Sequence, residues 1–336
     1  MTGGLIAATV AGAILVGVGM AGAIAKPRLK VKYPPPGRLV DVGGYRLHLD
    51  CQGMGSPAVI LDGGIGVETS LAWTRVQSGV SEFSRVCVYD RAGNGWSDAS
   101  PRPRTAQVMV DELRALLGAA EIPGPYVLVA HSFGGLVSRL YASMHPEEVA
   151  GMVLLDSAHE DQMERFPQEA VANVDLEKMT GMMSLLGYFL STGIPAIFHS
   201  KIPLQADLPD RDAATARALL ASGRKVMSTM VAEQRGLVES QNQVRSAPAL
   251  GDLPLIVISH GKPAPLPKSP GITPDVERRY EEVWQELQAE LAALSTKGEL
   301  VVARESGHAI QLDQPELVVD AVRRILDQTR TRSAAI

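Results

Sequence analysis

One stretch of the chain has the residue types and spacing of a nucleophile held on a sharp turn. An apolar run over residues 126–129 leads through Ala130 to Ser132, and Gly134 and Gly135 follow. Apolar residues at helical spacing begin directly afterwards, so the pattern predicts a strand, a tight turn and a helix, with Ser132 at the tip of the turn. Small residues two positions before and after the serine let strand and helix approach closely. Ordinary strand-to-helix turns share part of this pattern, so the rest of the chain has to decide.

A serine hydroxyl is a weak nucleophile at neutral pH, so Ser132 needs a base within hydrogen-bond reach and a group that orients this base. The sequence contains seven histidines. Of these, His308 lies in a glycine-flanked loop directly after the last predicted strand. Loops at the carboxyl ends of parallel strands meet at one edge of a sheet, so we expect His308 beside Ser132. His131 neighbours Ser132 in the sequence, and we expect it to point away from the site.

The carboxylate that orients the base has two candidates. Asp156 directly follows the apolar strand predicted over residues 149–155. The residues after the next predicted strand, 259–262, contain no Asp or Glu, and the first acid beyond them is Asp275, after a proline-rich loop. Position at the strand edge favours Asp156 over Asp275. A purely structural role for Asp156, as a helix cap or in a loop hydrogen bond, stays open.

A tetrahedral intermediate also needs preorganised N–H donors for its oxyanion. One predicted donor is the amide of Phe133, because free N–H groups at the start of a helix favour an anion. The second donor is predicted in the glycine-rich loop over residues 63–66, with Ile65 as the first choice.

Together these motifs resemble those of α/β-hydrolase fold proteins, in the group of haloperoxidase-like and epoxide-hydrolase-like enzymes with helical caps. The resemblance covers about residues 38–330 and rests on three stretches: Ala130-His131-Ser132-Phe133-Gly134-Gly135, Tyr89-Asp90-Arg91-Ala92-Gly93-Asn94-Gly95-Trp96-Ser97-Asp98 and Ser306-Gly307-His308. Ala130 departs from the family's nucleophile elbow, which has Gly there. The order Ser132, Asp156, His308 is the Ser–acid–His order of the family. The second stretch is implied to be structural rather than catalytic.

The resemblance also bears on the chemistry. Haloalkane dehalogenases and epoxide hydrolases of this group use an Asp nucleophile, so Ser132 argues against both activities. Some of the dehalogenases carry their acid after the sixth strand, which supports Asp156 by analogy.

Alternating strands and helices predict an α/β fold whose mostly parallel sheet is covered on both faces. The core is predicted over residues 38–156 and 252–336. Between them, residues 157–251 lose the alternation and are rich in methionine, which indicates an inserted helical cap. Adaptable methionine side chains would suit an apolar substrate.

The N-terminus has the composition of a membrane segment. Residues 2–25 contain no charged side chain, and at about 1.5 Å per residue a helix of this length reaches about 30 Å or more, enough to cross a bilayer. We therefore predict a transmembrane anchor over residues 1–25, followed by a basic and proline-rich linker over residues 26–37. The positive-inside rule places the catalytic domain on the cytoplasmic side. A cleaved signal sequence, and hence secretion, is the alternative.

Composition excludes several other classes of function. The formal charge of −5 gives no basic footprint for nucleic acid. The two cysteines are not expected to form a disulfide framework, and Cys87 is interpreted as a buried thiol. Neither cysteine has a second Cys or a His at metal-ligand spacing, so no zinc site is predicted. The predicted serine chemistry needs no metal or organic cofactor.

The sequence as a whole predicts a membrane-anchored serine hydrolase that cleaves a carboxylic ester or related acyl bond. The alternatives are amide, thioester or C–C hydrolysis, or cofactor-free perhydrolysis, which would use the same residues. A non-catalytic binding protein would be expected to lack one of the three residues.

Overall fold

The computed structural model describes residues 17, 19–66, 70–171, 175–204, 208–263 and 266–334. Its centre is one sheet, whose strands follow the predicted order along the chain: β1 Arg38–Asp41, β2 Arg46–Gln52, β3 Ala58–Asp62, β4 Val86–Tyr89, β5 Tyr126–His131, β6 Val149–Leu155, β7 Leu255–His260 and β8 Gly298–Ala303. In space the order is β1-β2-β4-β3-β5-β6-β7-β8. β1 pairs antiparallel with β2 and β2 antiparallel with β4, and all further pairs are parallel.

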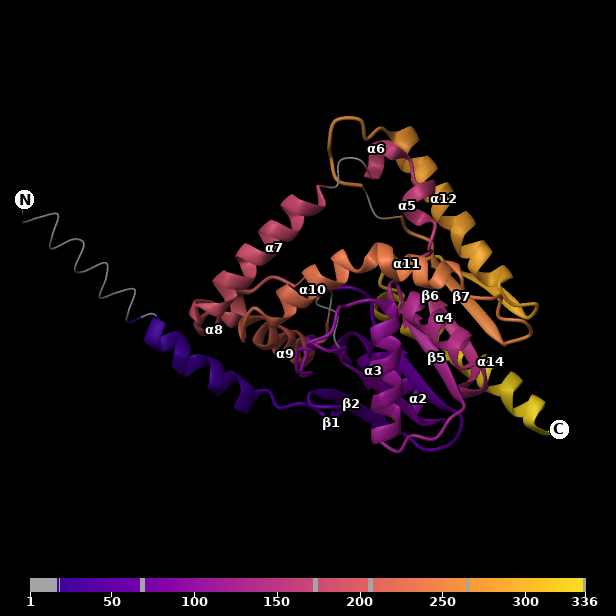
Figure 1. The fold of residues 1–336 in the computed structure, drawn as a ribbon, viewed down its shortest axis with the longest axis horizontal. Coiled ribbons are helices and arrows are strands. Elements are labelled where there is room, and N and C mark those ends of the chain that lie inside the picture. Colours follow the sequence, from indigo (N-terminus) through magenta and orange to yellow (C-terminus); the bar gives the residue numbers. More distant parts are fainter. Residues whose placement is uncertain are drawn as a thin grey trace, which may run out of the picture.

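Helices cover both faces of this sheet (Figure 1). Alternate residues of a strand point to opposite faces, so Leu128 and Ala130 of β5 join one buried cluster and Val127 and Val129 join the other. The fold is therefore the predicted α/β architecture with a covered, mostly parallel sheet. The covering elements are η1 Ser70–Trp73, α2 Thr74–Ser81, α3 Ala106–Ala119, α4 Gly134–Met144, η2 Pro146–Glu148, α12 Pro274–Ala293, α13 Ile310–Asp313 and α14 Pro315–Ala334.

A run of helices separates β6 from β7, as the loss of alternation predicted. We call these helices the helical insertion: α5 Gln162–Arg165, α6 Gln168–Val171, α7 Leu176–Ser191, α8 Ile194–Ile197, η3 His199–Lys201, α9 Asp210–Ala221, α10 Lys225–Arg235 and α11 Leu237–Arg245. α10 and α11 lie along the body of the molecule, whereas α7 projects away from it (Figure 1). The domain boundaries at residues 157 and 251 stay a prediction.

The predicted membrane segment lies mostly outside the described residues. Residues 19–32 are helical, and the basic residues Lys26, Arg28, Lys30 and Lys32 belong to this helix. The first part of the predicted linker over residues 26–37 is therefore helical, and its role as a linker stays a prediction. Among the residues that the structure describes, no helix has the length and apolar character needed to span a bilayer.

The two cysteines form a disulfide, which corrects the prediction of a buried free thiol. Cys51 of β2 and Cys87 of β4 are register partners in the antiparallel pair, with their Cα atoms 4.0 Å apart. Disulfides persist in oxidising compartments. The bond thus weighs against the cytoplasmic placement, which itself stays a prediction.

We expect the disulfide to stabilise the fold by about 2–4 kcal/mol, because it closes a loop across a sequence separation of 36 residues in the unfolded chain. The Cys51→Ala, Cys87→Ala double variant should lose this free energy of unfolding in denaturant titrations. The reductant-treated wild type should lose it as well. Two titratable thiols in the unreduced, denatured wild type would contradict the bond.

Candidate active site

Ser132 lies on a strained turn between β5 and α4. Its φ of 53° is in the left-handed region that side chains rarely adopt. Ser132 N donates to the carbonyl of Leu155 at 3.0 Å, and the Ser132 carbonyl accepts from Ala158 N at 3.0 Å. The backbone of the turn is therefore tied to the residues on both sides of Asp156.

The glycines after Ser132 allow close packing around this turn. A Cβ on Gly134 would lie 2.7 Å from the carbonyl oxygen of Gly63, and one on Gly135 would lie 1.8 Å from Ser157 Oγ. The sequence suggested that Gly134 lets strand and helix approach closely. The structure shows that it also lets the loop after β3 pack against the turn.

Asp156 and His308 are in direct contact at the carboxyl ends of β6 and β8. His308 Nδ1 lies 2.6 Å from Asp156 Oδ2. The Asp156 side chain is fully buried, whereas that of His308 is 47% exposed. Binding through Nδ1 leaves Nε2 of the imidazole as the nitrogen that can exchange a proton with a nucleophile.

Asp275, the alternative acid, lies elsewhere. It is in the first turn of α12, its side chain is 62% exposed, and it pairs with Arg278 at 2.5 Å. The structure therefore brings His308 to Asp156 and leaves Asp275 in a surface ion pair.

Asp156 has two further partners that the sequence analysis missed. His260 Nδ1 lies 2.8 Å from Asp156 Oδ2, and Trp284 Nε1 donates to Asp156 Oδ1 at 2.8 Å. Burial alone would raise the pKa of Asp156, but the hydrogen bonds from His260 and His308 hold this pKa well below its usual value. The carboxylate is thus held ionised in a buried position.

A second carboxylate lies behind His260. Its Nε2 is 3.0 Å from Glu281 Oε2 on α12, so both ring nitrogens face carboxylate oxygens and both carry protons. Burial lowers the pKa of His260, but Asp156 and Glu281 outweigh this effect and raise it to about 10. In the sequence, His260 stands at the end of a buried strand. This position is the signal that could have identified its pairing with the two carboxylates.

His131 does not point away from the site, which corrects the expectation from the sequence. Its ring is buried, its centroid lies 4.5 Å from that of His308, and its Nε2 lies 2.8 Å from the His308 carbonyl oxygen. A donor at Nε2 fits this contact, so His131 supports the backbone of the loop that carries His308.

Arg91 holds the loop that was predicted to supply an oxyanion donor. Its buried guanidinium donates to the carbonyls of Gly63 and Gly64 and pairs with Asp62 Oδ1 at 2.9 Å. In a trans peptide the carbonyl and the following N–H point in opposite directions. The Gly64 carbonyl faces Arg91, so the amide of Ile65 faces away from it.

Arg91 also connects this loop to two other elements. Its guanidinium carbon lies 5.5 Å from the ring centroid of Phe133, the other predicted donor. Its Nε lies 3.3 Å from Oε1 of Glu233 on α10, a side chain that is fully buried. One side chain of the predicted structural motif thus joins the glycine-rich loop, the Ser132 turn and the helical insertion.

Most of the chain matches a known family. The model of the alpha/beta hydrolase family matches residues 43–321. The chain belongs to the alpha/beta hydrolase family. It is a hydrolase, as the motifs predicted.

Individual matches extend over most of this hydrolase. It is 28% identical over 311 residues to a probable transporter of Hormonema carpetanum, across 86% of this chain and 42% of that protein. The hydrolase therefore spans less than half the length of that relative.

Solved structures share its fold. An esterase from Thermogutta terrifontis has a TM-score of 0.60 at 20% identity, covering 87% of the hydrolase and 98% of the esterase. A haloalkane dehalogenase from Bradyrhizobium elkani has a TM-score of 0.64 at 18% identity, covering 88% and 98%.

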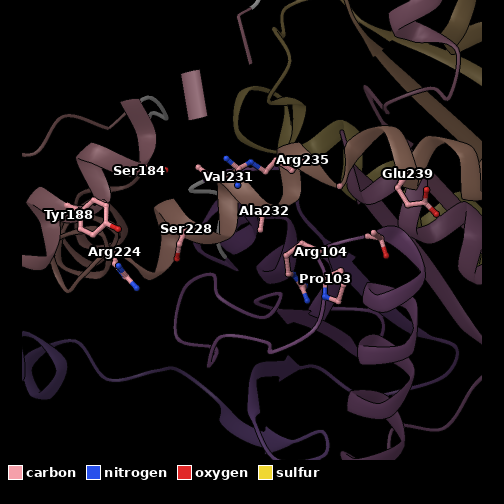
Figure 2. A pocket seen from close by; sticks show the side chains of 13 residues that line it. Pro103, Arg104, Ser184, Tyr188, Arg224, Ser228, Val231, Ala232, Arg235 and Glu239 are labelled. Carbon is pink, nitrogen blue, oxygen red and sulfur yellow. The ribbon is translucent and has the colours of Figure 1, made fainter. Parts of the chain in front are cut away.

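A cavity of about 580 Å³ lies between the helical insertion and the core of the hydrolase (Figure 2). Its wall includes Ser184 and Tyr188 of α7, Arg224 before α10 and Arg104 from the loop before α3. None of Ser132, Asp156 and His308 lines it. The cavity is therefore separate from these three residues.

The methionines of the insertion do not share one environment. Met182 is 67% exposed, whereas Met227 is buried. Met230 lies near the end of the glycine-rich loop, because a Cβ on Gly66 would meet its sulfur at 3.8 Å. Of these three, Met230 is the one placed beside the predicted oxyanion loop.

In the part of the chain that the structure describes, one cluster has ligand atoms close enough for a metal ion. Nitrogen or oxygen atoms of His145, Glu147 and Glu148 lie within 4.8 Å of one another. Glu148 is already bonded to Arg114 and Tyr141. These contacts account for the position of Glu148 without a metal.

Replacing His260 with Gln should change how stability depends on pH. The folded-state pKa of about 10 lies above the unfolded value of about 6.5. The stabilisation by charged His260 is therefore complete below about pH 6.5 and disappears as pH rises through about 10. The free energy of unfolding of wild type minus His260→Gln, from denaturant titrations, should be largest near pH 6 and shrink towards pH 10. A difference that stays constant over this range would contradict the charged pair.

Proposed function

We propose that this hydrolase cleaves a carboxylic ester or related acyl bond through an acyl-enzyme on Ser132. His308 Nε2 takes the proton from Ser132 Oγ as the hydroxyl attacks the acyl carbon. His308 then gives this proton to the leaving oxygen, and the same base activates a water that releases the acid. Asp156 fixes the imidazole and stabilises its charged form.

The observation that carries this proposal is the 2.6 Å contact between His308 Nδ1 and buried, ionised Asp156. It selects Nε2 as the base. The second support is the positive φ of Ser132 on a turn tied by backbone hydrogen bonds to the end of β6. A side chain held on such a turn projects its hydroxyl from the sheet edge.

The oxyanion in this proposal is bound by the amides of Phe133 and Ile65. Phe133 precedes the first residue of α4, where amides lack intrahelical partners. The bond from Arg91 to the Gly64 carbonyl supports an outward-facing Ile65 amide. Arg91 is then a positioning residue rather than a catalytic one.

Arg91→Lys should therefore lower kcat with little change in KM. Lysine keeps the charge between Asp62 and Glu233 but cannot bind both glycine carbonyls as the guanidinium does. We expect kcat to fall about 10-fold to 100-fold, less than the loss of a direct oxyanion donor. Steady-state kinetics with a soluble ester measure this split. A fall that merely follows the fraction of folded protein would contradict a positioning role.

The helical insertion is proposed as a cap over this site, with Met230 near the acyl group. The substrate is then a small, mainly apolar acyl compound, and no metal or organic cofactor takes part. Amide, thioester and C–C hydrolysis and perhydrolysis would use the same residues, so they remain alternatives to the ester.

Two measurements test the proposal. A fluorophosphonate probe should label Ser132, as located by mass spectrometry of the labelled peptide. Soluble p-nitrophenyl esters of graded chain length should be hydrolysed, with a preference that defines the acyl class. Labelling of a different serine, with the esters hydrolysed normally, would overturn the assignment of Ser132.

A further inference from the structure

Large apolar side chains gather on the outer surface of α7 and α8. Among the described residues, eight of the seventeen exposed large apolar side chains lie between residues 176 and 198. Their exposed fractions reach 67% for Met182, 70% for Leu185 and 59% for Phe198. An exposed surface on which large apolar side chains gather commonly marks an interaction site.

The composition of α7 distinguishes this surface from the single exposed apolar residues that are common on protein surfaces. From residue 179 to residue 198 the chain has no charged side chain. The solvent-facing side of a surface helix normally carries charged and polar side chains. Yet α7 packs by one side only, where Gly187 lies against Met227 and Leu190 joins the same buried cluster. The opposite side therefore lacks a cover within the described part of the chain.

The N-terminal helix extends this surface. A Cβ on Gly22 would lie 2.6 Å from the backbone of Gly193, so residues 19–32 cross the turn between α7 and α8 closely. Met20 and Ile24, on either side of that crossing, are 64% and 51% exposed. Within the described residues, 19–25 of this helix carry no charged side chain. We call Met20, Ile24 and the exposed apolar residues of 176–198 the docking face, leaving out Tyr188, which lines the cavity of Figure 2.

Positive charges border the docking face. Lys26, Arg28, Lys30 and Lys32 follow Ile24 on the same helix. This cluster stands out in a chain whose net charge is −5. Basic side chains beside an apolar helix face bind anionic headgroups, at about 1 kcal/mol for each Lys or Arg near the surface. A symmetric dimer on this face would instead bring two basic clusters together.

We propose that the docking face binds the surface of a lipid bilayer that contains anionic lipid. The apolar side chains of α7 and α8 enter the boundary between headgroups and acyl chains, and Lys26 to Lys32 contact the headgroups. α7 then separates the bilayer from the cavity of Figure 2, which Ser184, Gly187 and Tyr188 line from the same helix. This inference depends on exposed residues alone and does not require the proposed ester chemistry.

Single-cysteine labels on the full chain test the contact directly. Leu185→Cys and Phe189→Cys, each labelled with an environment-sensitive fluorophore, are mixed with phosphatidylcholine vesicles with or without phosphatidylserine. Val302→Cys on β8, 46% exposed, is the matched control. We expect a blue shift at positions 185 and 189, and quenching by lipid-borne nitroxide, with the anionic vesicles, and neither change at position 302. Leu185→Asp should reduce binding to these vesicles, and Val302→Asp should not.

Other outcomes would overturn the inference. Vesicle flotation without any spectral change at positions 185 and 189 would mean that the N-terminus alone binds lipid. A blue shift without vesicles that grows with protein concentration would mean that a second copy covers the face. Hydrolysis of a soluble short-chain ester, measured on the same labelled samples, reports separately on the proposed function.

Discussion

Ser132→Ala should lose essentially all hydrolysis of soluble esters. Removing the nucleophile removes the acyl-enzyme, so we expect kcat to fall on the order of 10⁵-fold to 10⁶-fold. The side chain is small and half-buried, so its replacement should leave the fold intact. Loss of Oγ on a residue with a φ of 53° leaves the backbone strain in place, because alanine meets the same steric limit there.

The measurement combines steady-state kinetics with fluorophosphonate labelling of the folded variant. Ser157→Ala is a suitable matched control, since Ser157 is a buried serine near the turn that has no proposed catalytic role. It should keep most of the activity. Full activity in Ser132→Ala at unchanged thermal stability would show that another group is the nucleophile.

Much of the fold could be predicted because the strands are apolar on both faces. The strands Val149–Leu155 and Leu255–His260 are fully or almost fully buried. Their runs of apolar residues were therefore enough to identify them in the sequence. Both end at the same sheet edge, which made Asp156 a candidate from its place in the sequence. Its position at the strand edge favoured Asp156 over Asp275, but the sequence could not show which of the two contacts His308, because loop lengths do not fix the path of a proline-rich segment.

Contacts that depend on helix orientation or strand order escaped prediction. His260 meets Glu281, 21 residues away, only because α12 turns one face to the end of β7. The Cys51–Cys87 bond requires β4 to pair with β2 outside β3, an order that the sequence of strands does not reveal. The continuation of the N-terminal helix through residues 26–32 was not predicted, because its packing of Leu29 against Ala196 and Ala218 joins residues far apart in the sequence.

Asp156→Asn should lower kcat by about 10⁴-fold, whereas Asp275→Asn should leave it nearly unchanged. Asparagine can donate as well as accept, so it no longer forces the proton of His308 onto Nδ1, and Nε2 loses its role as base. Asp275 is 62% exposed and paired with Arg278, and surface ion pairs of this kind contribute little to stability.

The same pair of variants separates orientation of the base from general weakening of the site. Asp156 also accepts from His260 and Trp284, so Asp156→Asn should cost stability as well as activity. Kinetics are therefore compared at a temperature where both variants are folded, as judged by circular dichroism.

Glu281→Gln provides the intermediate case: it removes the outer charge from His260 but keeps Asp156, so stability should fall while kcat changes far less. If Asp275→Asn lost the activity and Asp156→Asn kept it, the acid would have to reach His308 through a rearrangement of the loop before α12, and Asp156 would be the structural residue.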